Sequence, residues 1–63
     1  MKLRELMSVV YENVNVYKEV SNNEFQDLYK GSYRDVPEGL LDRTVIAVGV
    51  RKYSEVMLEV EIR

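Results

Sequence analysis

The chain has 63 residues, of which nine are basic and eleven acidic, so its net charge at neutral pH is −2. A chain this short is expected to form a single domain over residues 1–63, with marginal stability because it buries little surface. Small domains usually gain stability from disulfides, a structural metal or self-association. The sequence contains no cysteine and no histidine, which excludes disulfides and zinc sites made of thiolates and imidazoles. Self-association is therefore the expected source of extra stability.

Charge and hydropathy also bear on location and partners. No stretch reaches the ~20 apolar residues needed to cross a membrane, and Glu5 interrupts what would be the apolar region of a signal peptide. These features predict a cytoplasmic protein with no membrane partner. The mild net charge does not indicate a basic surface for nucleic acid.

The first segment has the apolar spacing of a helix. Its apolar side chains recur at intervals of three and four residues, which places them on one stripe: Leu3, Leu6, Met7 and Val10. Because this segment is short, we expect it to need a surface to pack on.

The segment after the predicted helix alternates between apolar and polar side chains. Residues 13–20 alternate between valine and polar or aromatic residues, which predicts a half-buried strand. Residues 21–23, Ser-Asn-Asn, are typical of a turn because asparagine tolerates left-handed backbone. Residues 25–33 predict a second strand, in which Gly31 can mark a bulge. The register of this strand stays open, since Phe25 and Leu28 differ in parity.

The second half predicts a short helix and two strands. Asp35 and Glu38 have capping-box spacing, which predicts one or two helical turns. Residues 44–51, with Ile46, Val48 and Val50 on one face, and residues 55–63 predict two strands joined by a short loop at 52–54. The predicted order is α-β-β-(short α)-β-β. We therefore expect an α+β fold, with the N-terminal helix packed on a four-stranded antiparallel sheet.

The sequence offers little catalytic chemistry. Without histidine and cysteine, the chain lacks the common general base at neutral pH and a thiolate nucleophile. Hydrolysis by paired carboxylates stays open, with the candidates Glu12, Asp27, Asp35, Glu38 and Asp42. Their spacing matches no metal-binding loop, and solvated charges and helix caps would use the same residues. We therefore predict no catalytic residue, no metal ligand and no cofactor.

Five tyrosines are the most unusual feature of the composition. Tyrosines can stack on the bases of single-stranded nucleic acid, contact another protein, or border a small core. Acidic residues interspersed among the basic ones make nucleic acid the least favoured of these partners.

One face of the predicted sheet is a candidate interface. It lies opposite the valine and leucine rows, and its small residues beside methionine and tyrosine permit close approach of another surface. The candidate interface residues are Tyr17, Val45, Ala47, Gly49 and Met57. The alternative is that residues 35–42 cover this face.

Several segments resemble small uncharacterised proteins from prophages and genomes of gut Firmicutes. The segments that carry the resemblance are residues 3–6 (LREL), 14–17 (VNVY), 28–32 (LYKGS), 35–43 (DVPEGLLDR) and 56–62 (VMLEVEI). A more distant similarity is to a short gut-prophage anti-CRISPR family of type II-A systems. That similarity implies an oligomer with a single-strand-binding type of sheet that acts on supercoiled DNA. The functional acidic residue of that family has no counterpart in the first strand, where Glu12 is the nearest acid.

Together these features predict a small prophage-type accessory protein that acts without catalysis, as a homo-oligomeric protein-binding module. A dimer is the simplest form, in contact face to face or edge to edge through an exposed strand. One alternative is an anti-defence protein that acts on DNA by weak, metal-assisted nicking or single-strand binding. Another is a structural stabiliser of a larger phage or host assembly.

Overall fold

A computed structural model describes the backbone of residues 1–52 and 56–63 and the side chains of residues 1–50 and 57–63. The elements are α1 (Leu3–Met7), β1 (Asn13–Ser21), β2 (Glu24–Ser32), the 3₁₀ turn η1 (Tyr33–Asp35), α2 (Glu38–Leu41), β3 (Val45–Lys52) and β4 (Val56–Ile62). This order confirms the predicted α+β fold and adds η1. The predicted loop at 52–54 lies outside the described residues, except for Lys52 at the end of β3.

The four strands form one mixed sheet in the order β2-β1-β4-β3. The hairpins β1–β2 and β3–β4 are antiparallel, but the central pair β1–β4 is parallel. The prediction of a wholly antiparallel sheet is therefore wrong. Since β2 and β3 consequently run in the same direction, residues 33–44 must cross from one end of the sheet to the other. Such a crossover needs about a dozen residues, and this segment is long enough to make it.

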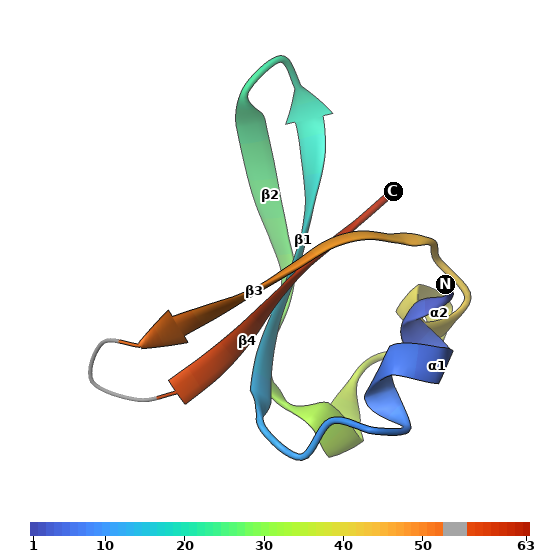
Figure 1. The fold of residues 1–63 in the computed structure, drawn as a ribbon. Helices are drawn as coiled ribbons and strands as arrows, with labels where there is room; N and C mark the ends of the chain where they lie inside the picture. The colour runs from blue at the N-terminus through green and yellow to red at the C-terminus, as the bar shows by residue number, and fades with distance from the viewer. Residues whose placement is uncertain (53–55) are drawn as a thin grey trace.

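The helices cover one face of the sheet. Figure 1 shows α1 and α2 side by side near the point where the two hairpins cross, while the far ends of both hairpins extend away from them. The buried cluster beneath the helices consists of Leu3, Val14, Val16, Val36, Val60 and Ile62. Leu6, Met7 and Val10 pack against this cluster, as the predicted stripe requires. The helix itself is shorter than predicted, because α1 ends at Met7 and Val10 lies beyond it.

The crossover segment joins the same core. Val36 is buried in the cluster, and Leu40 and Leu41 of α2 pack against it. These contacts place the segment on the helix-covered face. The alternative that residues 35–42 cover the opposite face is therefore wrong.

Acidic residues of the crossover form surface ion pairs and not the predicted capping box. Asp35 ends η1, and the N-cap of α2 is Pro37, without a side-chain hydrogen bond to the described residues. Arg4 of α1 donates to Glu38 at 2.8 Å and to Asp42 at 3.4 Å. Exposed pairs of this kind contribute about 0–1 kcal/mol. The predicted role of Asp35 as a cap is wrong, because the N-cap is Pro37 and α2 begins at Glu38.

A bulge in β2 reverses the alternation of the strand. Val16 lies opposite Tyr29, and the next residue of β1, Tyr17, lies opposite Asp27, so Leu28 is the additional residue. Tyr29 therefore shares the helix-covered face with Val16, whereas Asp27 shares the opposite face with Tyr17. The register of β2, which the sequence left open, is therefore different on the two sides of the bulge. Odd-numbered residues face away from the helices before Leu28, and even-numbered residues do so after it.

Gly31 does not mark a bulge, as the sequence predicted, but has a different role. It pairs in register with Val14 and has a φ of 156°. A Cβ at this position would lie 3.0 Å from Oη of Tyr29, whose hydroxyl donates to the Ser32 carbonyl at 2.7 Å. The absence of a side chain thus makes room for the Tyr29 ring over the strand.

Candidate functional site

The face of the sheet opposite the helices is here called the far face. Residues that pair across strands share a face, and the registers place on it Asn13, Asn15, Tyr17, Glu19, Phe25, Asp27, Lys30, Ala47, Gly49, Met57, Glu59 and Glu61. Carboxylates outnumber the basic residues on this face even when Arg51, which the register places opposite Met57, is counted with Lys30, so the far face has a net negative charge.

Val45 does not belong to the predicted interface face. A second bulge, at Ile46, shifts the register of β3, so that Val45 lies opposite Ile62 and packs against the core. The extra residue reverses the alternation, as it does in β2. Val45 therefore lies on the helix-covered face, contrary to the sequence prediction.

The other four interface candidates lie on the far face in different environments. Ala47 and Gly49 are exposed, and Tyr17 is half-buried. Met57 is only 4% exposed, so its side chain offers little area to a partner. The structure thus brings Tyr17, Ala47, Gly49 and Met57 onto one face without making them a continuous exposed patch.

The exposed apolar side chains of β3 form a second candidate surface, here called the β3 edge row: Ile46, Val48 and Val50. Their exposed fractions lie between 47% and 58%. Val48 and Val50 pair with Val60 and Leu58 and so lie on the helix-covered face. They remain uncovered because this end of the hairpin extends away from α1 and α2 (Figure 1).

A cavity of about 280 Å³ lies on the far face between β1, β2 and β4. Its lining residues are Asn15, Tyr17, Phe25, Asp27 and Glu59. The rings of Tyr17 and Phe25 meet edge to face, with 5.6 Å between their centroids and 80° between their planes. Asn15 is only 5% exposed, and its Oδ1 is buried without a hydrogen-bond partner among the described residues.

The local field at this cavity is negative. The pKa of Tyr17 is raised, first by partial burial of the phenol and then by the negative charges of Glu61 and Glu59. Both effects disfavour the phenolate. The Tyr17 hydroxyl therefore stays protonated and can donate a hydrogen bond.

Sequence reasoning missed most of this cavity. Of its lining residues, only Tyr17 was a predicted interface residue. Asp27 and Phe25 reach the far face because of the bulge at Leu28. The conflicting parity of Phe25 and Leu28 in the sequence was the one signal of that bulge.

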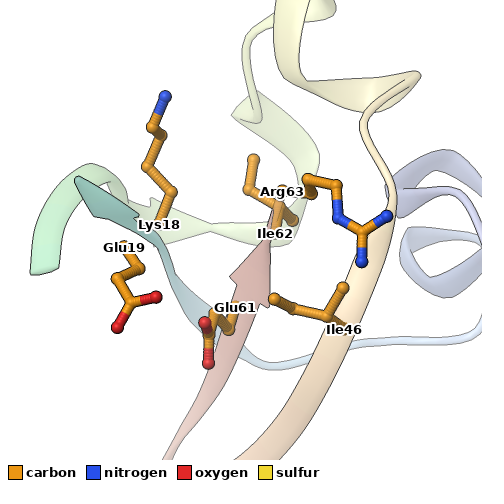
Figure 2. Close-up of a pocket in the computed structure, with 6 residues that line it drawn as sticks. All are labelled: Lys18, Glu19, Ile46, Glu61, Ile62 and Arg63. Carbon is orange, nitrogen blue, oxygen red and sulfur yellow. The ribbon is translucent and has the colours of Figure 1, made fainter. Parts of the chain in front are cut away.

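A second cavity, of about 390 Å³, lies near the end of β4 and is lined by Lys18, Glu19, Ile46, Glu61, Ile62 and Arg63. Figure 2 shows the charged ends of these side chains pointing in different directions. The ammonium group of Lys18 extends away from the carboxylates of Glu19 and Glu61. Since the charged groups do not converge, this cavity presents no arrangement for catalysis or for recognition of one ligand.

The carboxylates considered for hydrolysis lie in separate places. Asp27 lines the far-face cavity, whereas Glu38 and Asp42 bind Arg4 beside the helices. Within residues 1–52 and 56–63, no three acidic side chains are placed to hold a metal ion. No helix in the same part of the chain is long and apolar enough to span a membrane.

Comparisons with protein families, with curated proteins and with solved structures find no match to this chain. The resemblance to prophage and anti-CRISPR proteins therefore stays a hypothesis.

Proposed function

We propose that this chain is a non-catalytic binding module that self-associates, most simply as a two-fold dimer, through the free edge of β3. The observation that carries the proposal is the β3 edge row, in which apolar side chains about half exposed lie along an edge strand. Among the described residues, only the start of this edge is paired, by the bond from the Val45 N–H to the Met1 carbonyl at 2.8 Å. Such an edge presents backbone donors and acceptors ready to pair with another strand.

The two edges of the sheet differ in a way that favours β3. Proteins usually protect edge strands with charged residues or proline. The β2 edge carries Glu24, Asp27 and Lys30, whereas the stretch 45–50 of β3 contains no charged residue and no proline. Self-pairing is therefore opposed by charge at β2 and not at this part of β3.

Antiparallel pairing of two β3 strands about a two-fold axis would continue the sheet from one copy into the next. It would also bring Val48 and Val50 against their counterparts, so that exposed apolar area is removed from water. A face-to-face dimer through the far face has less support. It would bring the Asp27, Glu59 and Glu61 carboxylates of both copies together, and Met57 is already buried.

The acidic far face also favours a protein partner over DNA. Binding to nucleic acid rests on cations that neutralise phosphates. Two arginines are engaged within the chain: Arg4 binds Glu38, and Arg43 donates to the Arg63 carbonyl at 2.7 Å. An anti-defence protein acting on DNA is thus the less favoured alternative.

Light scattering of the purified protein tests self-association directly. One chain has a mass of 7.4 kDa, and the proposal expects twice that mass at micromolar concentration, with dissociation on dilution. A mass of one chain that persists at the highest soluble concentration would refute self-association.

A further inference from the structure

We propose that two copies of the chain pair through β3 in a single register, with Gly49 of one copy opposite Gly49 of the other. This inference rests on the proposed function, because it names the contact through which the dimer forms. It depends on the N-terminal residues that close the start of the β3 edge, on the point where the regular part of the strand begins, and on the positions of its valines.

The start of the β3 edge is already paired with the N-terminus of the same chain. The Leu3 N–H donates to the Arg43 carbonyl at 2.9 Å, and the Val45 N–H donates to the Met1 carbonyl at 2.8 Å. Since Val45 also pairs with β4, the N-terminus lies on its other side, where a second copy would have to pair. Residues 43–45 are therefore closed to self-association.

Symmetry restricts the registers that remain. A two-fold axis perpendicular to the sheet relates antiparallel strands and keeps each residue on its own face. The axis therefore passes beside one residue, which lies opposite its own counterpart. The bulge at Ile46 interrupts the strand, and basic residues at 51 and 52 would oppose like charges if the axis passed there. The axis is thus confined to 47–50.

The N-terminus excludes the early part of this stretch. With the axis at Val48 or before it, β3 of the second copy would run alongside residues 44 and 45, where the N-terminus already pairs. With the axis at Gly49, the second strand ends opposite Ile46 and passes none of the residues that are already paired. The paired stretch is then 47–51 of each copy.

The valines decide between the two axes that remain, at Gly49 and at Val50. Val48 and Val50 are 49% and 58% exposed, and both lie on the helix-covered face. With the axis at Gly49, each Val48 lies opposite Val50 of the other copy, and such cross-strand apolar pairs stabilise a sheet. With the axis at Val50, only one pair of valines would meet, and Val48 would lie opposite Lys52. The axis at Gly49 therefore buries more apolar surface.

Pairing in this register closes the assembly at two copies. The joined sheet has a β2 strand at either edge, and the charged residues of β2 oppose the addition of a further strand. The same axis keeps the helices of both copies on one side of the sheet. The acidic far faces consequently adjoin, so the dimer presents them as one surface.

Disulfide trapping tests the register, since the chain contains no cysteine of its own. Residues directly opposite one another in antiparallel strands have Cα atoms about 4.5–5.5 Å apart, a distance that a disulfide can span. The principal variant is Gly49→Cys, because no described atom lies within 4 Å of a Cβ at this position. Oxidised glutathione is the oxidant. The two thiols form one disulfide, and their protons and two electrons reduce it to two molecules of glutathione.

We expect Gly49→Cys to form the two-chain disulfide on a non-reducing gel at least roughly tenfold faster than Val48→Cys or Val50→Cys alone. In the latter two variants, the cysteines of the two copies are diagonal neighbours about 7–8 Å apart, too far for a disulfide. An equimolar mixture of Val48→Cys and Val50→Cys should form the mixed disulfide at a rate comparable with that of Gly49→Cys. A heavy-isotope label in one variant identifies this product by mass. Val20→Cys, at a position 50% exposed on β1, gives the background rate of random collision.

Light scattering of the reduced variants separates this inference from the proposed function. If the variants keep the dimer mass but Val48→Cys or Val50→Cys alone cross-links fastest, the register is wrong while self-association stands. Cross-linking of Gly49→Cys no faster than that of Val20→Cys, in a protein of dimer mass, would also overturn the register. A one-chain mass for the unsubstituted protein would overturn the proposed function, and the register with it.

Discussion

Tyr17 lies directly opposite Asp27 across the β1–β2 hairpin, one residue away from where regular alternation along β2 would place that carboxylate. The displacement comes from a single additional residue, Leu28. It moves a charged and an aromatic side chain of β2 to the far face, while the tyrosine that follows the bulge, Tyr29, stays with the core. Local backbone geometry thereby decides which chemistry each face of the sheet presents.

The core should depend most strongly on Leu3. Its side chain is fully buried in the cluster beneath α1, so Leu3→Ala should cost roughly 2–5 kcal/mol of unfolding free energy. In so small a domain this leaves much of the chain unfolded. Urea denaturation at fixed protein concentration measures the loss. Val9→Ala, at an exposed position just after α1, should change the value by less than about 0.5 kcal/mol. Equal losses in both variants would contradict the described core.

A side chain at position 31 should destabilise the protein. Its φ of 156° is rarely adopted by other residues, and an added Cβ would lie 3.0 Å from the Tyr29 hydroxyl oxygen. We expect Gly31→Ala to destabilise the protein by about 1 kcal/mol or more. Gly49→Ala is the matched control in a strand, because nothing lies within 4 Å of its added Cβ. That control should be neutral or stabilising. Thermal melts of the two variants measure the difference. The same melting temperature for Gly31→Ala and Gly49→Ala would contradict the prediction and show that Tyr29 moves aside.

Val48→Lys should convert a β3-paired dimer into monomers. The substitution brings the like charges of the two copies close to the two-fold axis and removes apolar contact. Val20→Lys is a close control, since Val20 is 50% exposed and Val48 is 49% exposed, yet Val20 lies at the far end of β1. Light scattering at equal concentrations should give one-chain mass for the first variant and dimer mass for the second. A dimer that survives Val48→Lys would place the contact elsewhere.

The protein should bind DNA weakly, because its acidic far face repels phosphates. We expect any binding to single- or double-stranded DNA to decline steeply as salt is added, since it would depend on a few phosphate contacts. Fluorescence anisotropy at two salt concentrations measures this. A supercoiled plasmid should remain supercoiled with magnesium present. Relaxation that is lost on chelation or in Glu12→Ala would instead support the nicking alternative.

The sequence by itself determined which segments become helix and strand. Spacings of three and four residues predicted α1 and its stripe, and the alternation of valines predicted β1, β3 and β4. The turn after β1 also followed from local chemistry. Asn23 adopts a φ of 61°, and its backbone N–H donates to the Glu19 carboxylate at 3.2 Å. These features depend on residues close together in the chain, so the sequence carries the signal for them.

Only the tertiary structure decided how the two hairpins lie together and which face each side chain joins. An alternating strand buries the same side chains beside a parallel or an antiparallel neighbour, so the parallel β1–β4 pair left no mark in the pattern. The direction follows from the crossover, in which Val36, Leu40 and Leu41 pack on the core between the end of β2 and the start of β3. The bulges at Leu28 and Ile46 then reversed the parity of β2 and β3, which moved Asp27 to the far face and Val45 to the core. A one-residue shift costs little in the local pattern but changes every later contact of the strand.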